Sequence, residues 1–438
     1  MVSRESKILR LERELHRIRT SPSLRLGSIV TDAMRRPWLA PFLVLTLPWS
    51  MLMIGLEMLG KKSPPAAFER VTQDPTLSER NCVVIFPTNG VGFGHFTRML
   101  ALAKHMKNED PALEIIFFTT MPTLHLLKPY GIPAHYISGS PYFDEMSTIE
   151  WNGLLEEELA ICFEAHRPKQ FIFDGAFPYR GMLRAIKARP HLDSIWMRRG
   201  TFRRGKSIPV DSISHFDLII HPEDSIAMQS SEVEHKVPSI TCPPITLIEP
   251  SEQMSRSQAR RRLELPQDAI VVYVQIGAGE INDINSEVRL TVDALTKREN
   301  VHVVLGESML GERFDIDLPR VHLLRDYPNY RYFKDFDFAV MAGGYNSFHE
   351  AIQASMPTIC LPNMKTGRDD QLARVIVAEE AGCMVVIRER NRKIIQAAID
   401  RIVESEVREM MKNNFQLLRR ENGATQVADW ISSQANLN

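Results

Sequence analysis

Residues 341–382 have the sequence MAGGYNSFHEAIQASMPTICLPNMKTGRDDQLARVIVAEEAG. Three short apolar runs lie in or next to this stretch, at 337–343, 357–362 and 383–387, and each predicts a buried parallel strand. The first strand ends in two glycines, and a helix is predicted to start near Asn346 and Ser347. Another helix is predicted to start at Asp370. This alternation of strand and helix is typical of a doubly wound parallel sheet.

The polar residues of this stretch stand at the two predicted helix starts. Glycines let the backbone approach a ligand closely, and the free N–H groups of a helix start favour phosphate. Glu350 lies about one turn into the first helix, where its carboxylate can accept hydrogen bonds from vicinal hydroxyls. Asp370 and Gln371 offer a carboxylate and an amide to further hydroxyls. The pattern suits a sugar nucleotide, and the residues at the first helix start are Gly343, Gly344, Tyr345, Asn346 and Ser347.

The same alternation extends toward both termini. Apolar runs at 82–87, 114–120, 169–174, 193–198 and 216–220 predict a first set of strands, and 241–250 predict a break. Runs at 269–277, 301–306 and 320–324 then lead into the three strands above, after a helix predicted over 257–266. We expect an α/β fold with two Rossmann-like doubly wound domains, 79–245 and 246–415, whose strand ends face a common cleft. Residues 405–435 predict a final helix or pair, and the segment 416–438 is expected to pack back on the first domain.

The first predicted strand leads into a glycine-rich helix start, FPTNGVGFGHFTRMLALAKHM (86–106). Its spacing is G-x-G-x-G rather than the G-x-G-x-x-G of dinucleotide sites, and the second strand ends without an acidic residue for a ribose. Both features disfavour NAD. Gly92 and Gly94 are candidate acceptor contacts, and His95 is expected at the mouth of the cleft; a helix-capping histidine is the alternative.

A carboxylate follows another predicted strand. The run FIFDGAFP (171–178) places Asp174 at the carboxyl end of its strand, where it also faces the cleft. A histidine that is oriented by a buried carboxylate is a good general base, because the carboxylate fixes the tautomer and stabilises the imidazolium. Spacing alone does not pair His95 with Asp174. Gly277, in YVQIGAGEIND (273–283), is a candidate diphosphate or acceptor contact, with an ordinary turn as the alternative.

A basic run, WMRRGTFRRGK (196–206), follows the strand at 193–198. Its arginines, Arg198 and Arg199 among them, could hold an acceptor phosphate or an anionic membrane surface. A solvated loop is the alternative.

The N-terminal region has a different composition. Residues 1–36 carry nine positive and four negative side chains, a net +5, and Ile8, Leu11, Leu15 and Ile18 form a helical stripe that could pair with another subunit. Residues 38–56 contain no charge, include Pro41 and Pro48, and precede a Pro-rich linker over 63–78. We expect 37–62 to associate with a membrane, by dipping into one leaflet or by spanning it; burial against protein is the remaining alternative.

The overall composition excludes several classes. The chain has 438 residues with 53 Lys+Arg and 54 Asp+Glu, a formal net charge of −1. This balance argues against a nucleic-acid binder. Its five cysteines are isolated from one another, which favours reduced thiols in the cytosol over disulfides or a zinc site.

Over about residues 78–435 the sequence resembles the GT-B nucleotide-sugar glycosyltransferases. This superfamily includes the plant small-molecule glycosyltransferases and the lipid-acceptor N-acetylglucosaminyltransferase of peptidoglycan synthesis. The likeness is strongest over 338–382, where Gly344, Asn346 and Ser347 match diphosphate-binding positions and Glu350 the ribose-binding glutamate. Pro357 and Pro362 match the family's prolines, and Asp370-Gln371 the sugar-hydroxyl pair. Tyr345 stands in place of the plant enzymes' tryptophan, and Ala342 in place of a phosphate-contacting histidine.

The resemblance also implies a mechanism. His95 matches the family's cleft histidine and Asp174 the aspartate that orients it, so His95 is the implied base toward an acceptor hydroxyl. Retaining members often carry Glu-x7-Glu, but Thr358 stands eight residues after Glu350, which favours inversion. A UDP-sugar donor, a lipid-linked or membrane-proximal acceptor, the cytoplasmic membrane face and no cofactor or metal are expected. The alternatives are a GT-B sugar-nucleotide 2-epimerase or hydrolase, and an inactive sugar-nucleotide-binding scaffold.

Overall fold

The computed structural model describes residues 18, 20–59, 61–62, 78–88, 92–139, 146–199, 210–226, 236–277, 284–309, 313–365 and 369–435. The chain divides into two compact units. The smaller comprises residues 1–80 with 145–167, and the larger comprises 81–144 with 168–438. The helical stripe predicted near the N-terminus lies outside the described residues, except for Ile18.

The first sheet contains seven strands in the order β3-β2-β1-β4-β5-β6-β7. Strands β1, β2 and β3 pair in parallel with one another, and so do β4, β5, β6 and β7. The order reverses between β1 and β4, which is where parallel sheets of this kind place their ligands. The strands are β1 (Arg80–Pro87), β2 (Glu114–Thr119), β3 (Ala134–Tyr136), β4 (Pro168–Asp174), β5 (Asp193–Met197), β6 (Leu218–Pro222) and β7 (Ser239–Cys242). The accompanying helices of the larger unit are α4 (Gly94–Glu109), η2 (Leu124–Tyr130), α6 (Arg180–Lys187) and α7 (Val210–Ile213).

The second sheet has six strands in the order β10-β9-β8-β11-β12-β13, again parallel, with its reversal between β8 and β11. The central strand β8 is a β-branched run whose Val271, Val272 and Val274 are completely buried, as expected for a strand covered on both faces. The strands are β8 (Ile270–Gln275), β9 (Val301–Gly306), β10 (Val321–Leu324), β11 (Phe338–Met341), β12 (Thr358–Cys360) and β13 (Met384–Val386). The helices are η5 (Pro250–Glu252), α8 (Arg256–Arg262), α9 (Ile284–Thr296), η6 (Asn329–Tyr332), α10 (Tyr345–Ala354), α11 (Gln371–Glu380), α12 (Arg392–Ile402), α13 (Ser405–Asn414), η7 (Phe415–Leu417) and α14 (Gly423–Ala435).

The structure differs from the predicted elements at three places. Strand β3 was not predicted, because three residues are too short to give a periodic signal. Strand β7 includes residues 241 and 242 of the segment predicted as a break, because the prolines that predict this break begin only at Pro243. Helix α8 ends at Arg262 rather than at 266, because Glu264 takes a left-handed φ of 54°.

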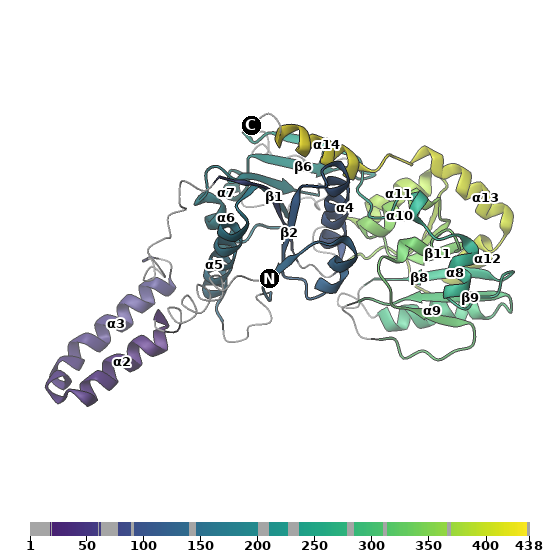
Figure 1. The fold of residues 1–438 in the computed structure, drawn as a ribbon. Helices are drawn as coiled ribbons and strands as arrows, with labels where there is room; N and C mark the ends of the chain where they lie inside the picture. Colours follow the sequence, from purple (N-terminus) through teal and green to yellow (C-terminus); the bar gives the residue numbers. More distant parts are fainter. Residues whose placement is uncertain are drawn as a thin grey trace. The chain divides into compact units, whose positions relative to one another are not determined.

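The C-terminal helix α14 returns to the first sheet. It lies beside α4 and β7 (Figure 1), and Thr425 Oγ1 is 3.2 Å from His105 Nδ1 of α4. At the start of α14, Gly423 N donates to Pro244 O at 3.0 Å. A Cβ at Gly423 would stand 2.0 Å from Pro243 O, so only glycine fits this approach. The last helix thereby ties the second half of the larger unit to the first.

The smaller unit contains a helical hairpin. Helix α2 (Pro22–Arg35) lies beside α3 (Leu43–Met58), joined by the 3-10 helix η1 (Pro37–Phe42) (Figure 1). Arg25 of α2 donates to the Glu57 carboxylate of α3 at 2.6 Å. Residues Pro37–Met58 are long and apolar enough to cross a membrane by length and composition, and little of this segment is buried. Trp38 and Trp49 are 69% and 63% exposed, so the described structure does not bury the segment against protein.

Candidate functional site

His95 is the second residue of α4, and Asp174 is the last residue of β4. The imidazole Nδ1 donates to Asp174 Oδ1 at 2.7 Å, which leaves Nε2 as the nitrogen that can accept a proton. Asp174 is completely buried, whereas the His95 side chain is 24% exposed. Burial by itself would raise the pKa of Asp174, but Arg98 and His95 hold this pKa below its usual value through charge and hydrogen bonds. The carboxylate is therefore ionised and fixes the orientation of the imidazole.

Arg98 is a residue of this site that the glycine-rich motif did not reveal. Its guanidinium binds both oxygens of Asp174, with Nε to Oδ2 at 2.8 Å and a terminal nitrogen to Oδ1 at 2.6 Å. Burial opposes the charge of Arg98, but Asp174 keeps its pKa above the usual value. Since Arg98 lies three residues after His95 on one helix, the i, i+3 spacing was the one sequence signal that could have suggested it.

Helix α10 begins opposite this pair, in the second half of the larger unit. Gly344 is its N-cap residue, and no side chain caps the helix. Asn346 Nδ2 donates to Gly94 O at 3.3 Å, so the start of α10 meets the start of α4. The Ser347 hydroxyl has no hydrogen-bond partner among the described residues. The structure thus brings His95 and the predicted diphosphate residues to one place and leaves the helix start open to an anion.

Glu350 lies on the same helix, about one turn after Asn346. No described residue is hydrogen-bonded to its carboxylate, and burial raises its pKa to about 8. Burial raises the pKa of the Tyr273 and Tyr330 phenols, and the negative charge of Glu350 raises them further. Glu350 is therefore close enough to both phenols to interact with them electrostatically. Asn329 Nδ2 donates to Tyr273 Oη at 2.9 Å. A carboxyl without a protein partner in this surrounding is suited to bind hydroxyl donors of a ligand.

Tyr345, the first residue of α10 and a predicted donor contact, is packed inside the protein. Its side chain is 2% exposed, and its hydroxyl donates to Glu223 O, after β6, at 2.8 Å. The guanidinium carbons of Arg98, Arg199 and Arg374 lie 5.5, 5.4 and 5.7 Å from its ring centroid. Tyr345 therefore joins the two halves and supports arginines close to the helix start.

An ion-pair network that the sequence did not suggest joins the two halves. Arg374 of α11 donates through Nε to Asp224 at 2.8 Å and through a terminal nitrogen to Gly343 O at 2.7 Å. It also pairs with Asp369, which Arg199 approaches to 3.2 Å. Burial alone would raise the pKa of Asp224, but His349 and Arg374 hold it far below its usual value. The network fixes the turn between β11 and α10 by way of the Gly343 carbonyl.

Asp370 and Gln371 are engaged within the protein. Asp370 is the N-cap of α11 and accepts from Ala373 N at 3.1 Å. Gln371 Oε1 accepts from Asn363 N at 2.9 Å. To bind sugar hydroxyls these groups would have to use their remaining donor or acceptor capacity.

The remaining predicted residues fall into two groups. Gly92, Gly94 and Gly344 have no atom within 4 Å of the place a Cβ would take, and Gly277 has a φ of 117° that favours glycine. In the basic run, the structure buries Arg198, which does not fit the alternative of a solvated loop at this position. It is 5% exposed, lies 5.5 Å over the Trp196 ring, and burial lowers its pKa to about 10. The further basic residues of the run at 203–206 lie outside the described residues.

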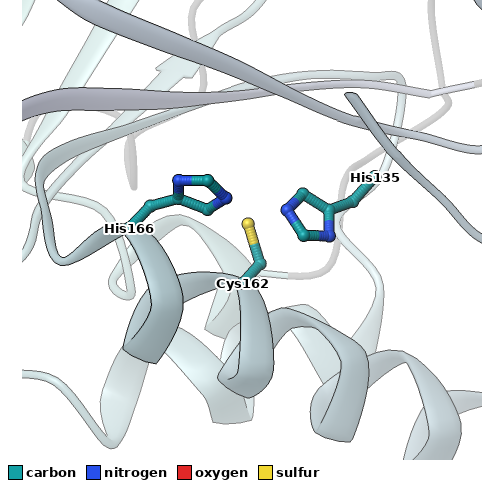
Figure 2. Close-up of side chains that lie close together, drawn as sticks. All are labelled: His135, Cys162 and His166. Atoms are coloured by element: carbon teal, nitrogen blue, oxygen red, sulfur yellow. The ribbon is translucent and has the colours of Figure 1, made fainter. Parts of the chain in front are cut away.

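Two potential metal ligands lie on α5 (Thr148–His166) of the smaller unit. Cys162 and His166 are one turn apart, on the same side of the helix (Figure 2). Two side chains of one helix do not complete the four ligands of a structural zinc site. His135, which Figure 2 also labels, belongs to β3, where its ring stacks on Phe118 at 6.4 Å between centroids. We assign no metal to these side chains.

Comparison with known proteins supports the fold. No protein-family model and no curated protein sequence matches the chain. Acinetobacter baumannii MurG matches it with a TM-score of 0.53 at 14% identity, over 80% of this chain and 99% of MurG. CalG4, the calicheamicin glycosyltransferase, matches with a TM-score of 0.53 at 17% identity, over 82% of this chain and 98% of CalG4. S. aureus MnaA, solved with UDP, matches with a TM-score of 0.56 at 12% identity, over 82% and 97%.

These likenesses show that the chain has a GT-B fold. The α/β class and the two parallel-sheet halves predicted from the sequence are thereby confirmed. A fold of this kind holds many chemistries, so activity has to be argued from the residues themselves.

Proposed function

We propose that the protein is a membrane-associated inverting glycosyltransferase that moves a sugar from a nucleotide sugar, a UDP-sugar, to a lipid-linked or membrane-proximal acceptor. The observation that carries this proposal is the hydrogen bond from Asn346 to Gly94 O. It joins the start of α4, which holds His95 against Asp174, to the uncapped start of α10. A base and an anion site at one place are what a displacement with a diphosphate leaving group requires.

The chemistry follows from this arrangement. His95 Nε2 takes the proton of an acceptor hydroxyl, and the acceptor oxygen attacks the anomeric carbon as the bond to the diphosphate breaks. Asp174, held ionised, stabilises the imidazolium that forms. The start of α10 stabilises the charge that develops on the diphosphate, the task that a metal ion has in other enzymes. The displacement is a single step, so the configuration at the anomeric carbon inverts.

The donor residues have separate tasks in this proposal. The N–H groups of Asn346 and Ser347 face the diphosphate, and Glu350 accepts hydrogen bonds from the ribose hydroxyls. Asp370 and Gln371 would contact the sugar. Arg199, which is 26% exposed in its side chain, remains a candidate acceptor contact, whereas the burial of Arg198 argues against a direct role for it.

The helical hairpin supports membrane association at one leaflet. Trp38 and Trp49 on the segment Pro37–Met58 are exposed aromatic residues of the kind that sit at membrane interfaces. Helix α2 lies along α3 and carries Arg25 and Asp32. A full span of the hairpin would place such charges in hydrocarbon, at roughly 2.5–3.5 kcal/mol each. An in-plane hairpin on the cytoplasmic face avoids this cost and keeps the sheets with cytosolic nucleotide sugars.

Incubation of the purified protein with a panel of nucleotide sugars and a membrane lipid extract tests the activity. Mass spectrometry is expected to find a lipid that has gained one hexose-type residue, together with free UDP. Isomerised or hydrolysed donor in the absence of any acceptor would instead indicate an epimerase or hydrolase. Binding of UDP without turnover of any donor would indicate a scaffold.

Flotation with vesicles that contain anionic lipid tests the membrane proposal. The double variant Trp38→Ser/Trp49→Ser is expected to lose most vesicle binding, since two interfacial anchors are removed. Leu417→Ser, at an exposed apolar residue of the other unit, is the matched control and should float as the wild type does. Equal flotation of the tryptophan variant and the wild type would contradict the proposal.

A further inference from the structure

The Arg98 side chain is both buried and hydrogen-bonded to a buried carboxylate. Its side chain is 2% exposed and binds Asp174 through two nitrogens, at 2.8 and 2.6 Å. The nitrogen that binds Oδ1 also lies 3.2 Å from His95 Nδ1. One carboxylate oxygen, Asp174 Oδ1, is therefore shared between the guanidinium and the imidazole.

This sharing has two chemical consequences. A two-nitrogen contact fixes the plane of the carboxylate, so that Oδ1 is held in the direction of the His95 ring. The permanent charge of the guanidinium also offsets the charge of Asp174. An imidazolium at His95 is consequently stabilised less than it would be by a carboxylate alone.

We propose that Arg98 is a positioning residue for the base, which orients Asp174 toward His95 and offsets the charge of that carboxylate. This inference rests on the proposed function for the identity of the reaction.

Several elements contribute charged and titratable groups that act on Arg98. Asp174 belongs to β4, Cys242 to β7 and Tyr345 to α10, and each of them interacts with Arg98. Arg199, after β5, adds a second positive charge, which is partly offset by Asp369. Asp174 is the single carboxylate among the described residues that contacts both Arg98 and His95.

The His95 titration, followed by imidazole NMR, tests the inference independently of any activity. The signals are assigned by comparison with His95→Gln. In Arg98→Met the midpoint of the titration is expected to move to higher pH by at least about one unit, because Asp174 then faces His95 alone. Arg98→Lys keeps the charge, so its midpoint should stay close to that of the wild type.

Arg260→Met is the matched control. Arg260 is a fully buried arginine that donates to the buried Asp335 at 2.6 Å, in the second half of the larger unit. The variant Arg260→Met should lower thermal stability as Arg98→Met does, but it should leave the midpoint of the His95 titration unchanged. A His95 midpoint in folded Arg98→Met that equals those of the wild type and Arg260→Met would overturn the inference.

Transfer kinetics give a second readout. Arg98→Lys is expected to lower kcat roughly ten- to hundredfold with an unchanged donor KM, since the two-nitrogen contact is lost while the anion site is intact. If Arg98→Met does not fold, the kcat and the donor KM of Arg98→Lys still test the inference. An unchanged kcat in Arg98→Lys would overturn it. A wild type that transfers no sugar would refute the proposed function instead, and the NMR titration would still test Arg98.

Discussion

The two ends of the candidate site differ in how fully the protein satisfies its own polar groups. At the α4 end, Asp174 is buried and its oxygens are bound by Arg98 and His95. At the α10 end, the Ser347 hydroxyl and the Glu350 carboxylate have no partner among the described residues, and the helix is uncapped. At the α4 end the polar groups are hydrogen-bonded to one another without a ligand. At the α10 end, polar groups remain that a ligand could bind.

This difference separates two kinds of functional residue. A proton acceptor must be oriented before the substrate arrives, so the fold itself supplies its partners. Groups that hold a diphosphate and a ribose must stay unpaired until the ligand binds, at a cost in stability. The comparison predicts that substitutions at the α4 end change turnover and that substitutions at the α10 end change affinity.

His95→Ala is expected to have the largest effect. Removal of the base should lower kcat by at least about a thousandfold, within the range for loss of general base catalysis. The affinity for UDP, measured by calorimetry, should stay within about threefold of the wild type, because His95 does not hold the donor. A variant that keeps full activity would remove His95 from the mechanism, and a loss of UDP binding would break the division between the two ends.

Glu350→Gln is expected to have an intermediate effect, which depends on pH. Burial raises the pKa of Glu350 to about 8, so the free protein holds this carboxyl largely protonated at pH 7 and ionised above pH 8. Ionised carboxylates bind hydroxyl donors more strongly. The UDP affinity of the wild type should therefore rise between pH 7 and pH 9.

The variant supplies the control for this pH dependence. Glutamine does not titrate, so any pH dependence of UDP affinity that remains in Glu350→Gln comes from titration of the nucleotide itself. At pH 9 the variant should bind UDP roughly tenfold more weakly than the wild type. Parallel pH profiles for wild type and variant would show that Glu350 does not contact the ligand.

Asp370→Ala is expected to have the smallest effect. Loss of the N-cap of α11 should lower the free energy of unfolding by about 1 kcal/mol. Asn391→Ala, which removes the N-cap of α12, is the matched control for stability. If both variants lose similar stability and keep their UDP affinity, Asp370 has a structural role as a helix cap and does not bind the ligand. A selective loss of affinity for the nucleotide sugar would instead move it to the ligand-binding group.

The sequence predicted the elements of the fold well, because buried β-branched runs such as 270–275 and helix starts such as Asp370 carry local signals. The predicted residues of both helix starts also lie together, as Asn346 and Gly94 show. The ion pairs were not predictable. Arg374 and Asp224 are 150 residues apart, and nothing local in either segment indicates the other.

The surroundings of two predicted side chains were not predictable for the same physical reason. A basic run such as Arg198-Arg199 has the composition of an exposed loop, but the first arginine is buried over Trp196 because β5 ends inside the molecule. Tyr345 lies at a motif position that suggested a ligand contact, and tertiary packing uses its hydroxyl to reach Glu223 O. Burial of this kind is set by residues distant in sequence.

The anomeric configuration of the product tests the central claim most directly. In the proposed mechanism, His95 activates the acceptor for a single displacement at the anomeric carbon. With an α-linked nucleotide sugar and an acceptor identified by mass spectrometry, NMR of the product should show a β linkage. An α-linked product would contradict the account, since retention requires a mechanism in which His95 does not act as the base for one direct attack.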